Sequence, residues 1–189
     1  LLEAGSAQQV AQVLPPFALG HQVATAAVVE PRFDFDTTRF ATTAAAKDGG
    51  FVLNGAKCFV PLADESQTIL VLAQLGEEQA AFLVPRGAAG VSIGEREQNM
   101  GVKALATYEV GLDNVAVPAS ARVGDAAAIS RILNRSRIAL GALAIGMGRA
   151  AFDYARDYAK ERKAFGVAIA QKQAIAFILA EMAIEIDAS

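Results

Sequence analysis

The chain contains few residues whose types could support catalysis or metal binding. It has one histidine, His21, and one cysteine, Cys58, which excludes a disulfide framework and a zinc site built from cysteine and histidine. His21 has no second ligand nearby in sequence and is predicted to be a surface residue. Cys58 lies in a strand-like segment and is predicted to be buried and inert. Both predictions favour a reducing, cytoplasmic location.

Three carboxylates gather in one loop after a predicted strand: Glu30, Asp34 and Asp36. Paired carboxylates can perform general acid–base chemistry. Three on one turn are more often solvated groups, or groups that cap backbone amides. We therefore predict a capping or solvated role for this cluster and no catalytic one.

One segment matches a loose dinucleotide-binding fingerprint, G-x-G-x-x-A, at Gly146-Met-Gly148-Arg-Ala-Ala151. That fingerprint binds phosphate only as a tight turn from a strand into a helix. Here it falls in the middle of a helical pattern, so we interpret the glycines as sites of close helix packing. The sequence has no Walker loop and no metal-ligand spacing, and no metal is predicted.

Composition indicates a folded chain with a substantial core. Of 189 residues, 53% are hydrophobic and 20% are charged, with a formal net charge of −3 and no basic run. This balance argues against nucleic acid as a partner. The apolar run Ile138–Met147 is too short to cross a bilayer, so no membrane insertion is predicted. Leu1–Val13 reads as a short amphipathic helix rather than a signal peptide, and the chain is predicted to be a piece of a longer protein.

The first half alternates short apolar runs with turn residues, which predicts strands. The predicted strands are Val23–Val29, Phe40–Ala46, Phe51–Leu53, Lys57–Val60, Thr68–Gln74, Ala80–Val84, Val91–Arg96, Tyr108–Leu112 and Val115–Val117. Predicted turns lie at 47–50, 76–78 and 87–90, and Asn54-Gly55 is a strong hairpin signal because both residues tolerate positive φ. Short, evenly spaced strands without helices between them predict an antiparallel barrel or sandwich.

The second half has helical periodicity. From Asp125, a predicted N-cap, apolar or small residues recur every three or four positions, which predicts one helix to about Arg162, ending near Gly166. A second helix is predicted from about Gln171. Two helices cannot close a bundle core, so we expect an oligomer or missing chain to complete it. The predicted divisions are residues 1–20 as the end of a helical region, 21–122 as the β-domain and 123–189 as the helical domain.

Three groups of motifs resemble the acyl-CoA dehydrogenase family. Val28-Val29-Glu30-Pro31 is similar to its V-T-E-P, and Asn54-Gly55-Ala56-Lys57-Cys58-Phe59 to its N-G-x-K-x-W/F. The run 99–103 is similar to its N-M-G-x-R turn, and 115–124 to its V-x-V-P-x-x-x-x-L-G strand. The runs 161–166, 173–175 and 179–183 resemble E-R-x-x-F-G, Q-A-I and L-A-E-M-A. Order and spacing agree across nearly the whole chain.

This resemblance implies an α+β fold: an antiparallel β-barrel, then the first helices of an up-and-down bundle, cut from a longer chain. It also implies an FAD-dependent oxidoreductase that removes the α-proton of an acyl-CoA with a carboxylate and passes the β-hydrogen to flavin N5 as hydride. Related enzymes carry the base either beyond Ser189 or at the position aligned with Ser136. Serine cannot act as that base, so no catalytic residue is nominated in this chain.

The resemblance also assigns binding residues by position. The flavin is expected against five residues of the β-domain: Val28, Val29, Phe59, Val60 and Pro61. Arg162, Phe165 and Gln173 match residues that reach a neighbouring subunit's FAD, and a guanidinium suits pyrophosphate. Phe35, Asn134 and Arg137 are expected to contact the acyl-CoA. The implied partners are the acyl-CoA substrate, a homo- or hetero-oligomer and an electron-transfer flavoprotein or similar acceptor.

Several positions depart from the family pattern. Val29 and Pro61 replace threonines that contact the flavin, Arg32-Phe33-Asp34-Phe35 replaces a small-residue loop, and Asn134 replaces an aspartate. Each lost hydrogen bond costs roughly 1 kcal/mol. We therefore hypothesise that this chain is the partner in a heteromer that lends residues to another subunit's FAD. An ordinary homo-oligomeric dehydrogenase and a non-catalytic acyl-CoA-binding or scaffolding relative remain alternatives.

Overall fold

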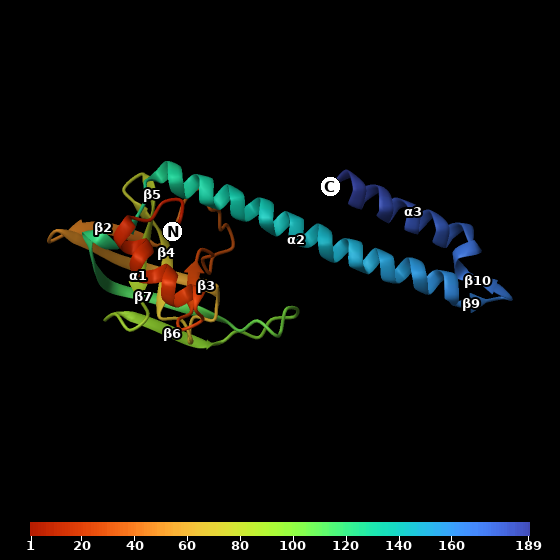
Figure 1. The fold of residues 1–189 in the computed structure, drawn as a ribbon, viewed down its shortest axis with the longest axis horizontal. Helices are drawn as coiled ribbons and strands as arrows, with labels where there is room; N and C mark the ends of the chain where they lie inside the picture. The colour runs from red at the N-terminus through yellow and green to blue at the C-terminus, as the bar shows by residue number, and fades with distance from the viewer. The chain divides into compact units, whose positions relative to one another are not determined.

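The computed structural model describes residues 1–189, which divide into two compact units, Leu1–Leu133 and Asn134–Ser189 (Figure 1). The first unit opens with helix α1, Ala7–Ala18. This helix begins at Ser6 because the Ser6 hydroxyl accepts from the Gln9 amide while the Gln9 side chain accepts from the Ser6 amide. The helix predicted over Leu1–Val13 therefore exists but lies further along the chain.

A single mixed sheet forms most of the rest of the first unit. Its strands are β1 (Ala24–Ala27), β2 (Thr43–Lys47), β3 (Gly50–Pro61), β4 (Thr68–Leu75), β5 (Glu78–Pro85), β6 (Val91–Arg96), β7 (Thr107–Pro118) and β8 (Arg122–Val123). The order is β6-β7-β3-β2-β4-β5-β8, with β1 paired to β4. Most ladders are antiparallel, but β4 pairs in parallel with both β1 and β2. The α+β class is confirmed, whereas an entirely antiparallel sheet is wrong.

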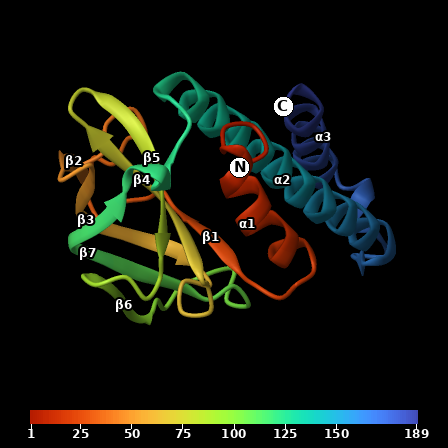
Figure 2. The same cartoon turned by 60° about the vertical axis from the view of Figure 1, so that its left-hand side comes forward.

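The sheet curls so that strands distant in its order share one interior (Figure 2). The Phe51 ring on β3 lies 5.0 Å from the Phe82 ring on β5, centroid to centroid. Around them, fully buried side chains such as Leu53, Ile69 and Val110 form the main core. Burying these side chains is the dominant favourable term for this unit, at roughly 1.5–3 kcal/mol for each large one.

Asn54-Gly55 does not form the predicted hairpin, because β3 runs through it without a turn. Gly55 has φ +149°, and a Cβ there would lie 2.7 Å from Thr42 Cα, so glycine allows two backbones to approach closely at a β-bulge. The actual two-residue turn is Asp48-Gly49, whose φ values of 49° and 76° are typical of a type I′ turn. The two strands predicted on either side of Asn54-Gly55 are therefore one strand.

The second unit contains most of helix α2 (Ala126–Glu161), the small strands β9 (Lys163–Ala164) and β10 (Val167–Ala168), and helix α3 (Gln173–Ala188). The Asp125 carboxylate accepts from the Ala128 amide at 2.7 Å, which confirms the predicted N-cap. The fingerprint glycines lie in mid-helix, as predicted. A Cβ on Gly148 would lie 4.0 Å from Ile186 of α3, whereas nothing lies within 4 Å of Gly146, so the packing interpretation holds at Gly148 alone.

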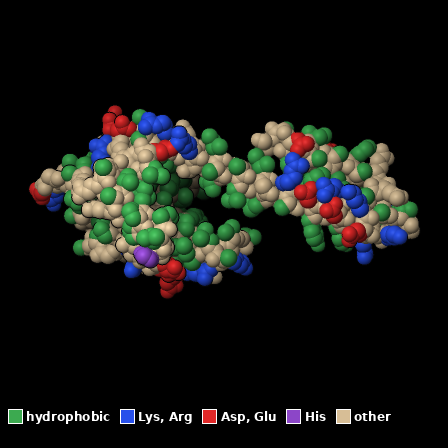
Figure 3. Space-filling view, in the orientation of Figure 1, with side chains coloured by type: hydrophobic (Ala, Val, Ile, Leu, Met, Phe, Trp, Pro, Cys, Tyr) green, Lys and Arg blue, Asp and Glu red, His purple; other side chains and the backbone are tan.

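Helices α2 and α3 leave many large apolar side chains exposed, among them Ile138, Leu140, Leu143, Tyr154 and Ile184. Figure 3 shows hydrophobic side chains between the charged ones on this unit. Helix α2 is also long and apolar enough to cross a membrane by length and composition. A single such helix is weak evidence for a span, since core helices of soluble proteins pass the same test.

Candidate functional site

Two of the segments nominated from sequence, 28–29 and 59–61, lie side by side in the first unit. The Cys58 amide donates to the Val29 carbonyl at 2.9 Å, which joins the chain after β1 to the end of β3. The β3–β7 register shifts between Lys57 and Val60, so the strand bulges where the two segments meet. Bulges redirect side chains next to binding sites. Cys58 itself is buried, as predicted, and burial raises the pKa of its thiol.

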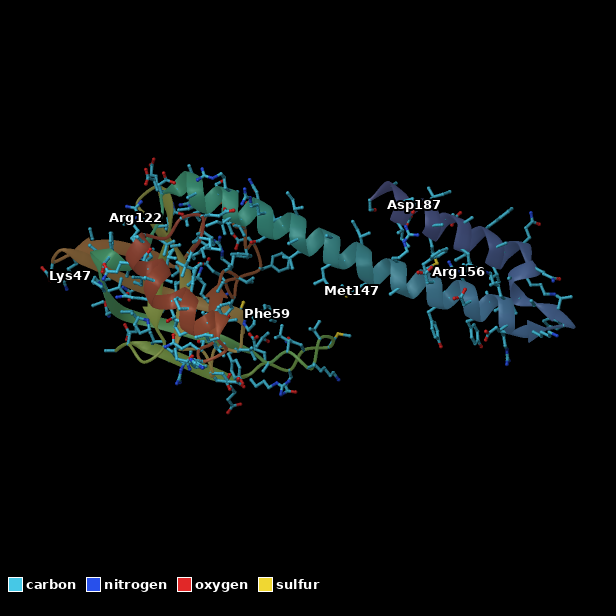
Figure 4. The ribbon with its side chains drawn as sticks, in the orientation of Figure 1. Lys47, Phe59, Arg122, Met147, Arg156 and Asp187 are labelled. Carbon is cyan, nitrogen blue, oxygen red and sulfur yellow. The ribbon has the colours of Figure 1, made fainter.

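Phe59 is the most unusual residue of this bulge. Its φ is +52°, a conformation that a bulky residue adopts at a cost of roughly 1–3 kcal/mol. The ring is 53% exposed at the edge of the β-domain (Figure 4). Its amide does not join the ladder but donates to both carboxylate oxygens of Glu97, each at 3.1 Å. An exposed aromatic ring held in a strained backbone is a surface that a planar ligand can stack on.

Segments 28–29 and 59–61 together form one surface of the β-domain, called the wall. Its other nominated residues differ in how far their side chains are exposed. Val28 is half-buried and packs against the second core cluster, which includes Phe40 and the first turns of α2, while Val29 is also half-buried. Val60 is 1% exposed and points into the main core, so only its backbone could face a ligand. Pro61 is half-buried and has no amide donor.

A buried ion pair lies directly behind the wall. Lys57 Nζ donates to Glu30 Oε1 at 2.9 Å and to the Val28 carbonyl at 3.2 Å, and both ionic side chains are almost fully buried. Glu30 also accepts from the amides of Ala41 and Thr42, at 2.7 and 2.8 Å. Glu30 is therefore a capping group, as predicted for the acidic cluster, but a buried one rather than a solvated one.

The charges of this pair are set by its surroundings. Burial raises the pKa of Glu30, but hydrogen bonds from the two amides and from Lys57 outweigh that effect and lower its pKa to about 2. Burial lowers the pKa of Lys57 to about 8, although the ion pair with Glu30 opposes the shift. Both groups are thus charged at neutral pH.

The loop that follows Glu30 is anchored from within. Arg32 Nε lies 3.4 Å from Glu30 Oε2, and the Arg32 guanidinium donates to the Arg39 carbonyl. Phe35 packs 6.4 Å from Phe40, centroid to centroid, and joins the second core cluster. Phe33, by contrast, is fully exposed. The large side chains of this loop therefore differ: Arg32 and Phe35 contact the β-domain, whereas Phe33 is exposed to solvent.

The nominated residues of the second unit gather at its hairpin. Phe165 and Gly166 turn the chain between β9 and β10 with φ values of 55° and 82°, and the Phe165 ring is 96% exposed. Lys172 Nζ lies 5.4 Å from the centre of that ring, and Gln173 follows as the first residue of α3. Arg162 is exposed and its guanidinium makes no ion pair or hydrogen bond within the chain. This hairpin end offers an unpaired cation, an aromatic ring and an amide to another molecule.

Asn134 and Arg137 lie one turn apart on α2, both exposed, and Arg137 donates to the Asn134 side chain at 2.8 Å. Asn134, where the resemblance expects an aspartate, thus accepts a hydrogen bond from the arginine through its side-chain oxygen. Phe35 lies with the β-domain in the second core cluster.

Two features of this site were not predicted from the sequence: the Glu30–Lys57 ion pair and the contact between Glu97 and the Phe59 amide. Lys57 and Glu30 stand 27 positions apart, and only their place in adjacent motifs hinted at a contact. Glu97 carried no signal, because its role depends on a backbone amide that the bulge removes from the ladder.

A curled sheet followed by a long helix, a small hairpin and another helix defines the middle and C-terminal parts of an acyl-CoA dehydrogenase. Comparison with known families agrees. The profile "Acyl-CoA dehydrogenase, middle domain" matches residues 25–115, and "Acyl-CoA dehydrogenase, C-terminal domain" matches residues 124–189. The chain belongs to the acyl-CoA dehydrogenase family, and the resemblance drawn from its motifs is confirmed.

Individual relatives place the chain within longer proteins. It is 37% identical to benzylmalonyl-CoA dehydrogenase of Aromatoleum aromaticum, covering 98% of this chain and 51% of the relative. It is 32% identical to a caffeyl-CoA reductase–Etf complex subunit of Acetobacterium woodii, covering 100% and 52%. The structure of a glutaryl-CoA dehydrogenase from Mycobacterium smegmatis in complex with FADH2 aligns with a TM-score of 0.84 and 28% identity, over 96% of this chain and 48% of that one. The chain thus spans about half the length of these proteins.

The residues present suit FAD in part. The exposed Phe59 side chain suits a planar ring system, and the unpaired Arg162 of the second unit suits a pyrophosphate. Val29 and Pro61 supply no side-chain donor for the polar end of that ring. The β-domain surface therefore suits the ring by stacking and lacks hydroxyl contacts at two positions, and the hairpin of the second unit separately offers a cation.

Proposed function

We propose that this chain is part of a subunit of an FAD-dependent acyl-CoA dehydrogenase, which introduces an α,β double bond into an acyl-CoA thioester. The observation that carries the proposal is the wall formed where 28–29 meets the β3 bulge. There the strained, exposed Phe59 is held by Glu97. Strain of this kind persists where the surrounding structure enforces it, and it is concentrated at binding sites.

FAD, when bound, would supply the hydride acceptor of this reaction. The contribution of the chain's own residues would be binding and orientation: Phe59 by stacking, and Val28 by apolar contact that excludes water. Phe35, Asn134 and Arg137 are proposed to contact the acyl-CoA, with the Arg137 guanidinium, held by Asn134, directed to its nucleotide phosphates. The catalytic carboxylate is proposed to lie outside this chain, since Ser136 occupies the alternative position.

The hairpin end is proposed to act on a neighbouring subunit. Arg162, Phe165 and Gln173 are exposed, and Phe165 lies in a turn with 96% of its surface exposed and Lys172 Nζ 5.4 Å from its ring centre. We infer that these three contact the FAD of an adjacent subunit in a homo- or hetero-oligomer. An electron-transfer flavoprotein, or a similar acceptor, would take the electrons onward, and the assembly would work in the cytoplasm.

A second candidate is that this chain holds no flavin of its own and only completes a partner's site. It is favoured by the contrast between the two halves: Val29 and Pro61 lack hydroxyls, whereas Arg162, Phe165 and Gln173 keep the family's residues. The partner would then be a homologous subunit with an intact β-domain.

Stoichiometry of bound FAD separates these candidates. The complete gene product is purified alone and after co-expression with a neighbouring homologue, and FAD is counted per chain. One FAD per chain in the protein alone supports the first candidate. FAD that appears only with the homologue, at one per pair, supports the second. No FAD in either preparation contradicts both and favours a non-catalytic acyl-CoA-binding or scaffolding role.

A further inference from the structure

The buried Glu30–Lys57 pair has a role beyond stabilising the fold. Both side chains lie in the interior, at 3% and 0% residue exposure. Burying two charges is costly, and a buried pair usually stabilises a protein no better than apolar residues of the same size. The presence of a buried pair at this position is better explained by the segments that it holds in place.

What it holds is the wall itself. Lys57 reaches back to the Val28 carbonyl at 3.2 Å and to Glu30 at 2.9 Å, and its ammonium lies 4.4 Å from the centre of the Phe40 ring. One lysine therefore fixes three points of the chain between residues 28 and 40. The amide of the next residue, Cys58, donates to the Val29 carbonyl, so Lys57 and Cys58 both hydrogen-bond to segment 28–29.

Glu30 extends this connection to β2. Its carboxylate accepts from Ala41 and Thr42, the two residues before that strand begins. Thr42 in turn lies against Gly55 of β3, where a Cβ would come within 2.7 Å of it. The Asn-Gly motif thus makes room for the segment that Glu30 binds.

We propose that Glu30 and Lys57 are positioning residues for the flavin, which set the separation between 28–29 and the Phe59 bulge. This inference rests on the proposed function, because it names the residues that shape that site without touching the cofactor. Neither side chain can reach a ligand on the wall, since both are almost fully buried. Their effect on FAD must pass through the Cys58–Val29 hydrogen bond and the direction of the Phe59 ring.

The test uses Lys57→Met in the complete gene product, with Val117→Ala as the matched control. Val117 is a buried core residue paired with Phe51 at the opposite end of β3, so its truncation destabilises the same domain without touching the wall. For each variant three quantities are measured: the melting temperature of the apoprotein, the FAD dissociation constant, and hydrogen exchange at the Cys58 amide.

We expect Lys57→Met to raise the FAD dissociation constant and to speed Cys58 exchange, each by about tenfold or more, as for the loss of a charge-assisted hydrogen bond. Val117→Ala should lower the melting temperature, leave the FAD dissociation constant unchanged and speed exchange at Cys58 no more than at the other buried amides of β3. Unchanged FAD affinity in Lys57→Met, or a change no larger than in the control, would show a purely structural pair and overturn the proposal.

A second variant covers the case in which Lys57→Met does not fold. Glu30→Gln/Lys57→Met removes both charges and should be about as stable as the wild type, yet its FAD affinity should remain about tenfold weaker. Recovery of affinity together with stability would overturn the proposal. If the wild-type protein binds no FAD with or without a partner, the proposed function fails, and positioning of the flavin fails with it. Cys58 exchange that is faster in Lys57→Met than in Val117→Ala would then show only that the pair holds segment 28–29 against β3, and equal exchange in the two variants would refute that connection as well.

Discussion

The acid stability of the β-domain should depend on a single buried carboxylate. Glu30 accepts hydrogen bonds from Ala41, Thr42 and Lys57, which lower its pKa from 4.5 to about 2 in the folded chain. In the unfolded chain these contacts are lost and the pKa returns to its ordinary value. Because the folded state binds this proton more weakly, Glu30 stabilises the fold above about pH 4.5 and loses that contribution as the pH falls toward about 2.

The magnitude follows from the two pKa values. A change from 4.5 to about 2 corresponds to about 3 kcal/mol of unfolding free energy at neutral pH. About 2 kcal/mol of this should be lost between about pH 6 and about pH 3. Glu30→Gln keeps an acceptor for the two amides but cannot titrate, so the variant should lack this part of the pH dependence.

The assay is urea unfolding of wild type and Glu30→Gln at a series of pH values over that range. Other carboxylates contribute to both proteins, so the difference between the two curves isolates Glu30. Glu78→Gln is the control, because Glu78 is exposed and its ion pair with Arg122 spans 3.8 Å on the surface. It should follow the wild-type curve.

Parallel curves for wild type and Glu30→Gln would refute the reasoning. They would mean that Glu30 titrates alike in the folded and unfolded chains, and so that the hydrogen bonds described here do not hold its charge.

Three further predictions test the fold and the hairpin end. Gly55→Ala should destabilise the β-domain by about 2 kcal/mol or more in urea unfolding, because its Cβ would collide with Thr42 at a positive φ; an unchanged midpoint would contradict the close approach. Asp125→Ala should cost about 1 kcal/mol through loss of the bond from the Ala128 amide, and an unchanged stability would mean that the cap is not needed. Phe165→Ala should leave the melting temperature of the apoprotein unchanged, since the ring is 96% exposed, while weakening FAD binding by the assembled oligomer about tenfold; equal affinity would remove Phe165 from the proposed site.

Local sequence patterns predicted which segments are helices or strands better than they predicted where the turns between strands lie. The helix from Asp125 follows from an N-cap and a sustained period, both local properties, and the structure confirms it. Asn54-Gly55 and Asp48-Gly49 carry similar hairpin signals, and only tertiary context decides between them. At Gly55 the neighbouring Thr42 backbone uses the space that glycine leaves, and the strand continues.

The site shows the same limit. The family resemblance assigned 28–29 and 59–61 to one ligand, but it did not predict the Glu30–Lys57 ion pair, because a contact between residues 27 apart depends on how the sheet pairs. Val60 was nominated with its neighbours and points into the core, since a bulge changes which side chains face outward. The Phe165-Gly166 hairpin went unpredicted beyond a helix end, because positive φ is not expected of phenylalanine.

The most direct test of the proposed function is the visible absorption spectrum of the purified complete gene product, recorded without oxygen before and after adding an acyl-CoA. The first candidate predicts flavin bands in the protein alone that bleach as the acyl-CoA reduces the cofactor. Bands that appear and bleach only with a co-expressed homologue would assign this chain to the supporting role. A protein that stays colourless in both preparations would contradict the account of this chain as part of a flavin-dependent dehydrogenase.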